Sequence, residues 1–383
     1  MTFGRSVVCF AAVLLAACSS NSRIEQELPA TLTEFKQQAQ VRELWSTDVG
    51  SLSGKYDARL VPVFDANTIY VANATGRVMA LASDSGRVRW NTDINAPVTG
   101  ATAIGEGLVV VGSRKGEVFA LDASDGKPRW TGRVSSEVQA PPAIGRGIVV
   151  VQTVDGKVTG LSAADGKRLW IFDRSEPALS LHGTSQPSIV SDVVLAGFAN
   201  GKIVALQLKD GKLLWEQTVA QPHGRNEVER LVDVDAPTLL WGDILYAVAY
   251  QGKAIALDMR TGRGAWSRDV SSYVSVDADR TAVLVSDERG HVLAFDARAG
   301  ASLWRQDKLH GRGLSGPVLH GDLIAVGDFE GYLHWLARDD GHFVARFRLD
   351  KSPVRARAIV DGATMYVASQ DGRLAALQLT RAQ

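Results

Sequence analysis

Residues 116–130 read GEVFALDASDGKPRW, and residues 156–170 read GKVTGLSAADGKRLW. The two stretches share the pattern G-x-V-x-x-L-x-A-x-D-G-K-x-x-W. Repetition at a fixed period of about 40 residues is the signature of repeat architectures, in which each unit packs on its neighbours. Further copies, some of them degenerate, begin at Gly76, Gly201, Gly252, Gly290, Gly331 and Gly372. The chain therefore contains eight units of one repeat.

Each unit predicts a small antiparallel sheet. A turn residue before the first glycine, as in Asp155-Gly156, favours a tight hairpin because such turns need a positive φ. The alternating apolar positions that follow predict a strand, and the D-G pair predicts a second turn before the strand that holds the tryptophan. Two shorter β-branched runs precede each glycine. Four strands per unit are typical of a propeller blade.

The last unit is incomplete, since the chain stops before its tryptophan. Residues 43–46, ELWS, read like the missing strand. An N-terminal strand that completes the last sheet would close the ring and remove open sheet edges. We therefore predict an all-β fold, an eight-bladed β-propeller spanning residues 42–383. The repeated tryptophans are expected to fill the gaps between blades; the alternative is an exposed stripe for stacking a ligand. They are Trp45, Trp90, Trp130, Trp170, Trp215, Trp266 and Trp304.

The first residues predict export and lipidation. A short apolar run ends in Leu15-Ala16-Ala17-Cys18, too brief to cross a bilayer, and small residues before a cysteine resemble the bacterial lipobox. Residues 1–17 are then a signal peptide and Cys18 is the lipidated residue; a plain secretion signal is the alternative. Ser19 after the cysteine implies sorting to the outer membrane, with the protein facing the periplasm. Residues 18–41 are expected to form a tether containing one or two helical turns.

Composition excludes several classes of function. Lys plus Arg and Asp plus Glu both number 42, so no net charge favours nucleic acid or an anionic membrane surface. The seven histidines show no metal-ligand spacing, and we interpret them as scattered surface or turn residues. No metal site and no catalytic motif is expected.

The repeat resembles that of the pyrroloquinoline-quinone dehydrogenases, which hold a quinone and calcium in the central channel. Many of them place a vicinal disulfide against the quinone, whereas the only cysteines here are Cys9 and Cys18. A periplasmic quinoprotein is therefore the alternative function, and we expect no cofactor. A propeller that binds peptidoglycan or another cell-surface component is a third possibility.

Two connections between units are longer than the others. The stretches from Trp170 to Gly201 and from Trp215 to Gly252 exceed the corresponding stretch after Trp130. Both join successive blades, so they should emerge side by side on one face, and surplus loop on a rigid scaffold often carries recognition. The first holds Leu179 and Leu181, and the second holds Asp233 and Asp235. Leucines flanked by charges predict an exposed patch for a protein partner; alternatively, the leucines face inward and the aspartates cap turns.

Taken together, the lipobox, the closing strand, the eight repeats, the segment RLVDVD at residues 230–235 and the segment GYLHW at 331–335 resemble the BamB family of propeller lipoproteins. This resemblance covers essentially the whole chain. It implies a non-enzymatic subunit of the outer-membrane β-barrel assembly machinery (the BAM complex) that binds the periplasmic POTRA domains of BamA and assists nascent barrel proteins.

The resemblance also implies which residues meet the partner. The contacts carry over to Leu179, Leu181, Asp233 and Asp235. They also carry over to His182, which stands where the family pattern has arginine. Since histidine is mostly neutral above a pKa of about 6.5, one charge-assisted contact is in doubt at that position.

Overall fold

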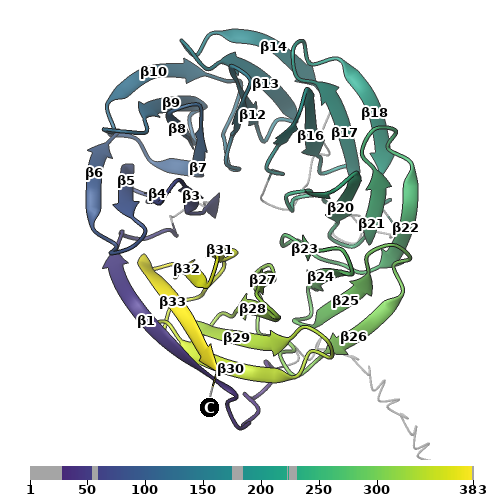
Figure 1. Cartoon of the computed structure of the whole chain (residues 1–383). Coiled ribbons are helices and arrows are strands. Elements are labelled where there is room, and N and C mark those ends of the chain that lie inside the picture. Colours follow the sequence, from purple (N-terminus) through teal and green to yellow (C-terminus); the bar gives the residue numbers. More distant parts are fainter. Residues whose placement is uncertain (1–27, 54–58, 175–183, 222, 224–230, 382–383) are drawn as a thin grey trace, which may run out of the picture.

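Eight small sheets form a ring in the computed structural model of the chain (Figure 1). The structure describes residues 28–53, 59–174, 184–221, 223 and 231–381. No helix occurs among these residues, and so none of them forms a helix that could cross a membrane. The predicted eight-bladed propeller is confirmed.

Blades 1 to 4 each contain four antiparallel strands in sequence order, from the channel outward, because each apolar run is followed by a turn. A short strand β2 (Arg59–Leu60) lies parallel to the inner strand of blade 2. Their bounds are, for blade 1, β3 (Val63–Asp65), β4 (Thr68–Ala72), β5 (Arg77–Ala82) and β6 (Val88–Asp93); for blade 2, β7 (Val98–Gly105), β8 (Leu108–Ser113), β9 (Glu117–Asp122) and β10 (Pro128–Arg133); for blade 3, β11 (Ala143–Gly145), β12 (Ile148–Gln152), β13 (Lys157–Ser162) and β14 (Arg168–Asp173); for blade 4, β15 (Ser188–Val190), β16 (Val193–Gly197), β17 (Lys202–Gln207) and β18 (Leu213–Thr218).

Blades 5 to 7 repeat this order, and blade 8 takes its fourth strand from the N-terminal end of the fold. Their bounds are, for blade 5, β19 (Leu239–Trp241), β20 (Ile244–Val248), β21 (Lys253–Asp258) and β22 (Gly264–Asp269); for blade 6, β23 (Asp277–Ala278), β24 (Ala282–Ser286), β25 (Val292–Asp296) and β26 (Ser302–Gln306); for blade 7, β27 (Val318–His320), β28 (Leu323–Gly327), β29 (Tyr332–Ala337) and β30 (Phe343–Arg348); for blade 8, β31 (Ile359–Asp361), β32 (Thr364–Ala368), β33 (Arg373–Arg381) and β1 (Ala39–Asp48).

Strand β1 closes the ring. It pairs antiparallel with β33 (Figure 1). In this pairing Glu43 lies opposite Leu377 and Trp45 lies opposite Ala376. Arg373 adds a hydrogen-bonded ion pair with Glu43 at 2.9 Å. The predicted closure is confirmed, and it protects the edge of β33 that would otherwise be open.

The repeated tryptophans lie between blades, as predicted. In each case the indole Nε1–H donates to a backbone carbonyl of the next blade, and the ring covers the glycine of the turn between the third and fourth strands there. For Trp130, the acceptor is Ala163 at 2.7 Å, and a Cβ on Gly166 would stand 2.5 Å from the indole. Burying an aromatic ring of this size stabilises a fold by a few kcal/mol. The other bonds of this kind are Trp45 to Ser83, Trp90 to Ala123, Trp170 to Leu208, Trp215 to Met259, Trp266 to Ala297 and Trp304 to Arg338.

The segment before β1 lies across the outer strand of blade 7. Residues 28–38 contain no helix, so the helical turns expected for residues 18–41 are absent from the described part of that range. Strand β1 begins at Ala39, slightly before the expected start of the propeller. The physical reason is a continuous set of contacts with blade 7, among them the stacked rings of Phe35 and Phe343 at 5.3 Å. These contacts hold the segment in an extended form.

Candidate partner-binding site

The two long connections meet at their inner ends. The first joins β14 to β15 and the second joins β18 to β19. The Ser185 hydroxyl donates to the carbonyl of Ala236 at 3.5 Å, and the hydroxyls of Ser188 and Thr238 lie 3.1 Å apart. The expectation that these connections lie side by side is met at the part of each that the structure describes.

Only some of the residues predicted to contact the partner belong to the part of the chain that the structure describes. Leu179, Leu181 and His182 lie outside the described residues. Cys18 of the lipobox and Arg230 of the second connection also lie outside them. The site predicted from the sequence therefore rests, in the structure, on the flanks of these connections and on Asp233 and Asp235.

Asp233 and Asp235 are both buried, with exposed fractions of 1% and 2%. The backbone around them is fixed: the Tyr250 N–H donates to the Asp233 carbonyl at 2.8 Å, and the Val234 N–H donates to Phe198. Val234 packs where Gly197 leaves room, because a Cβ there would stand 2.3 Å from the Val234 carbonyl. The expectation that these aspartates belong to an exposed rim is wrong. Alternation of acid and valine suggested one face in water, but the acids and the valine between them are all almost fully buried.

The outer strands of blades 3 and 4 carry exposed apolar residues. Leu169 and Ile171 on β14 are 52% and 43% exposed, and Leu213 and Leu214 on β18 are 47% and 51% exposed. Isolated apolar residues on a surface are ordinary, but grouped ones mark places where a protein partner can bind.

An ion pair ties these two outer strands together. Arg174, just after β14, pairs with Glu216 on β18, and Lys202 Nζ lies 2.6 Å from the same carboxylate. The outer strands of blades 3 and 4 are therefore held together by charged side chains.

The centre of the ring holds a cavity of about 900 Å³. Asp235, Asp277, Arg355 and Arg357 line it, among mainly apolar residues. Arg357 is engaged by Asp277 at 2.7 Å and donates to the Pro317 carbonyl at 3.0 Å. Asp277 and Arg357 are therefore used to hold blades 6, 7 and 8 together.

The interpretation of the histidines as scattered surface or turn residues is wrong for three of them. His291, His320 and His334 are buried, and each takes part in a hydrogen-bonded group. His334 Nε2 lies 3.0 Å from Asp328 and its Nδ1 accepts from Arg346 at 3.1 Å. One sequence feature could have indicated this for His334. His334 and Trp335 stand on the predicted third strand of their unit, where the other units have different residues.

Comparison with known proteins agrees with this architecture. The family model described as outer membrane protein assembly factor BamB matches residues 36–106, 96–306 and 288–382. Outer membrane protein assembly factor BamB of Pseudomonas aeruginosa is 50% identical over 365 residues, which cover 95% of this chain and 96% of that protein. The chain belongs to the BamB family. The corresponding protein of Alkalilimnicola ehrlichii is 44% identical, over 98% of this chain and 97% of its own.

A solved BamB structure has the same fold. The crystal structure of BamB from Moraxella catarrhalis matches with a TM-score of 0.81 and 29% identity, over 88% of this chain and all of that one. Membership of the BamB family makes the chain an outer membrane protein assembly factor and not an enzyme.

More distant neighbours share the fold alone. The quinohemoprotein alcohol dehydrogenase of Comamonas testosteroni matches with a TM-score of 0.70 at 15% identity, over 88% of this chain and 76% of that one. The residues of the cavity do not suit a quinone and its calcium ion. Asp277 is neutralised by Arg357, and the described residues contain no cysteine. Fold likeness does not carry the chemistry of that site to a BamB protein.

One exposed group on the described part of this BamB protein has the composition of a metal site. Asp339, Asp340 and His342 lie together in the turn between β29 and β30. His342 Nδ1 already lies 2.6 Å from Asp340, and hydrogen bonds from His342 lower the pKa of the Asp340 carboxyl. Turns in the other blades use the same aspartate to hold the backbone, as Asp125 accepts from the N–H of Lys127. The group is therefore explained as a turn.

Proposed function

We propose that this protein is the non-catalytic scaffold of the BAM complex and that it docks on the periplasmic POTRA domains of BamA through blades 3 and 4. Leu179, Leu181 and His182 would contact the partner directly. Cys18 would carry the lipid that holds the protein at the outer membrane, facing the periplasm. The docked scaffold would assist insertion of β-barrel proteins.

The single observation that carries this proposal is the union of the two long connections. Hydrogen bonds from Ser185 to Ala236 and between Ser188 and Thr238 join their inner ends. Residues from both connections are therefore held in one place, as a rigid docking surface requires. The outer strands of the same two blades also expose apolar side chains, Leu169 and Ile171 on β14 and Leu213 and Leu214 on β18.

The burial of Asp233 and Asp235 gives them a different role from the leucines. A carboxylate with almost no exposed surface cannot meet a partner without rearrangement. We infer that the two aspartates position the second connection and that they act on BamA through it.

The experiment compares two double variants by co-purification with BamA and by thermal unfolding. Leu179→Ala with Leu181→Ala should weaken binding about 30-fold or more, because a buried interface anchor contributes about 2 kcal/mol, and should leave unfolding unchanged. A matched control, Leu44→Ala with Leu303→Ala, removes exposed leucines from the outer strands of blades 8 and 6 and should change neither. Full co-purification of the folded 179/181 variant would refute the proposed site.

The second double variant tests the aspartates. Asp233→Ala with Asp235→Ala should lower both binding and stability, the latter by about 1–3 kcal/mol, since buried polar groups lose their partners. Lost binding with unchanged unfolding would instead show that these carboxylates touch BamA themselves.

A further inference from the structure

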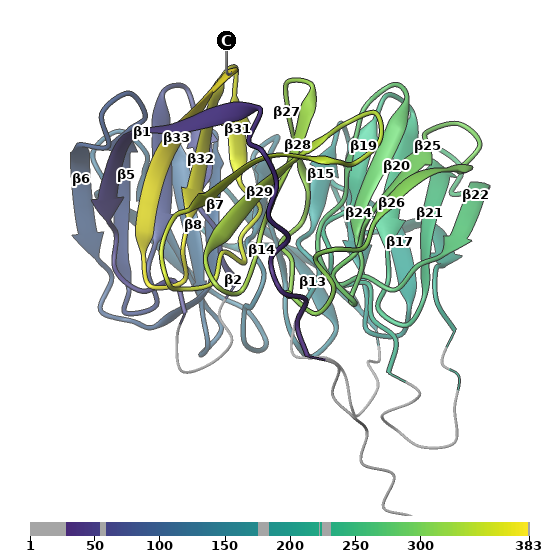
Figure 2. The same ribbon diagram turned by 90° about the horizontal axis from the view of Figure 1, so that it is seen from below.

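Residues 29–38 form an extended strap on the outside of blade 7 (Figure 2). Backbone hydrogen bonds hold it at both ends: the Ala30 N–H donates to His310 at 2.8 Å, and the Gln38 N–H donates to Val344 at 2.9 Å. The strap therefore has a fixed start and a fixed end on the ring.

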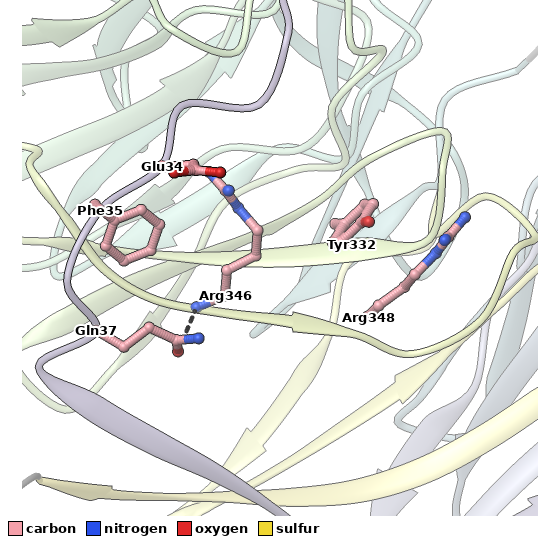
Figure 3. Close-up of a pocket in the computed structure, with 6 residues that line it drawn as sticks. All are labelled: Glu34, Phe35, Gln37, Tyr332, Arg346 and Arg348. Carbon is pink, nitrogen blue, oxygen red and sulfur yellow. Dashed lines mark hydrogen bonds between the residues drawn. The ribbon is translucent and has the colours of Figure 1, made fainter.

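Arg346 of β30 grips the middle of the strap (Figure 3). Its Nη1 donates to the Thr33 carbonyl at 3.0 Å, and its guanidinium lies 5.0 Å from the Phe35 ring centre and 5.3 Å from that of Phe343. The Gln37 side chain accepts from the Arg346 N–H at 3.2 Å. A cation beside a pair of stacked rings, together with directional hydrogen bonds, holds a peptide segment in one register.

A buried charge network supports this grip. Arg346 Nε donates to His334, which bonds to Asp328, and Asp328 also accepts from Arg312 Nε at 2.8 Å. Arg312 in turn donates to the Ala30 carbonyl at 3.1 Å and pairs with Glu330. Two arginines organised by one carboxylate thus hold the strap at two points, which a random surface contact would not do.

The direction of the strap decides on which face the chain leaves the ring. His310 and Arg312 lie in the connection from β26 to β27, whereas Val344 lies at the start of β30, next to the turn after β29. All connections from the fourth strand of one blade to the first strand of the next share one face, because every blade has the same strand order. Figure 2 shows the strap crossing from β1 to the opposite edge of the ring. Its Ala30 end is therefore on the connection face.

We propose that the strap fixes the orientation of the anchored ring, with its connection face toward the membrane. This rests on the lipid at Cys18 in the proposed function. Twelve residues lead from Cys18 to Ala30 and span at most about 43 Å when extended, so the point at which the strap meets His310 stays tied to the bilayer. The connections that carry Leu179, Leu181, His182, Asp233 and Asp235 open on the same face. The partner surface of the scaffold would then lie on its membrane-proximal side.

The test measures which face is nearer the lipid in the full lipidated chain. Because the sequence after Cys18 has no cysteine, single introduced cysteines can carry a fluorophore. Lys308→Cys and Lys351→Cys label the connection face on blades 6 and 7, and Arg298→Cys and Asp339→Cys label the opposite turns of the same blades. The vesicles contain phosphatidylethanolamine and phosphatidylglycerol with a nitroxide on the headgroup.

Quenching should be about twofold or more stronger at 308 and 351 than at 298 and 339, since a strand of five to six residues separates the faces by about 17–20 Å. Phe35→Ala, and separately Arg346→Ala, should remove this difference. Lys36→Ala, an exposed change on the same strap, should preserve it.

Two further readouts make the result decisive. Hydrogen exchange at Ala30 and Gln38 reports strap release, and tryptophan fluorescence reports the folded ring. Equal quenching on both faces of the wild type, or an unchanged difference once the strap amides have lost protection, would overturn the proposal. Failure of the chain to float with vesicles would remove the anchor and overturn it as well. BamA co-purification is scored separately, so docking can succeed when the orientation proposal fails.

Discussion

Blade 3 and blade 7 each pair one tryptophan with one small residue on the neighbouring strand, but in opposite strand order. In blade 3, Trp170 on the outer strand β14 lies opposite Gly160 on β13. In blade 7, Trp335 on β29 lies opposite Ala345 on the outer strand β30. Each described blade thus places one indole against one small residue, but blade 7 moves the indole inward by one strand.

The hydrogen bond to the next blade is preserved by a different route. Trp170 donates directly to the Leu208 carbonyl of blade 4 at 2.8 Å. Trp335 donates to His320 Nδ1 at 3.2 Å, and His320 Nε2 then lies 3.0 Å from the Ala363 carbonyl of blade 8. Since Nδ1 accepts, Nε2 carries the proton and donates. A histidine relay therefore replaces a direct bond.

Closure of the ring explains the exchange. An outer-strand tryptophan bonds to the turn between the third and fourth strands of the next blade, but in blade 8 those strands, β33 and β1, come from opposite ends of the chain. No such turn exists there, and the strap crosses in its place, with Ala39 packed in the same cluster as Ala345. The shift of the tryptophan to the third strand of blade 7 thus occurs next to the blade in which the two ends of the fold pair.

The largest expected effect follows from removing the inward indole. Trp335 is completely buried, so Trp335→Ala should lower the free energy of unfolding by about 3–5 kcal/mol through the lost contacts and the cavity. The midpoint of urea unfolding measures this. Trp241→Ala, at a residue 45% exposed, is the control and should change stability by less than about 0.5 kcal/mol.

A double variant sharpens the comparison. Trp335→Ala with Ala345→Trp restores the order of blade 3, yet the new indole has no turn carbonyl to bond and would displace the strap. We expect it to be no more stable than Trp335→Ala alone. Recovery to the wild-type midpoint would show that the exchange has no connection with closure.

Removing the His320 relay should lower the stability by an intermediate amount. His320→Ala leaves the Trp335 N–H and the Ala363 carbonyl without their partner, which costs about 1–3 kcal/mol for buried groups. His320→Gln can accept and donate at the same two points, so it should recover most of the loss in urea unfolding. His342→Ala, at an exposed histidine, should have no effect. Equal midpoints for the Ala and Gln variants at position 320 would contradict the relay.

The sequence predicts the parts of this fold that depend on local pattern. Glycine turns, alternating strands and one tryptophan per unit repeat along the chain, so eight blades follow, and the incomplete last unit with ELWS at 43–46 predicts closure. The surplus length of two connections likewise predicts that they lie together. These inferences need only neighbours in sequence and the rule that blades stack.

What could not be predicted depends on residues far apart in the chain. The strap meets blade 7 across some 300 positions, as in the bond between Arg346 and Thr33, and no local pattern records such a pairing. Asp233 and Asp235 alternate with valines as surface residues would, but blades 4 and 5 enclose them. The sequence shows that Trp335 departs from the repeat. The reason for this departure is the missing turn between the third and fourth strands of blade 8, which only the structure shows.

The smallest expected effect is a loss of stability at acidic pH. It concerns blade 7 alone, because the contact between this blade and the strap depends on a neutral His334. His334 is completely buried against Asp328, Arg346 and Arg312, with the rings of Tyr332 and Phe343 beside it. Burial lowers its pKa below the ordinary value of 6.5, although Asp328 opposes this. Protonation would place a proton on Nδ1, facing the Arg346 Nε–H that it now accepts. The bond that positions Arg346 on the strap would be lost.

The direction of the pH effect follows from proton uptake. Below pH 6.5 the unfolded chain binds a proton at His334 that the folded chain excludes, so stability falls as the pH decreases, by at most about 1.4 kcal/mol per pH unit for one proton. The pKa of Asp328 is below its usual value because hydrogen bonds from His334 and Arg312 outweigh burial, so Asp328 contributes only at lower pH. Between pH 7 and pH 5, the protection factors of the Ala30 and Gln38 amides, measured against the intrinsic exchange rate at each pH, should fall before the ring unfolds. His334→Gln keeps a donor toward Asp328 and an acceptor toward Arg346 without titrating, so its strap amides should exchange at a rate that follows intrinsic chemistry alone. An equal acid response in His334→Gln would assign the effect to another group and leave His334 a purely structural part of blade 7.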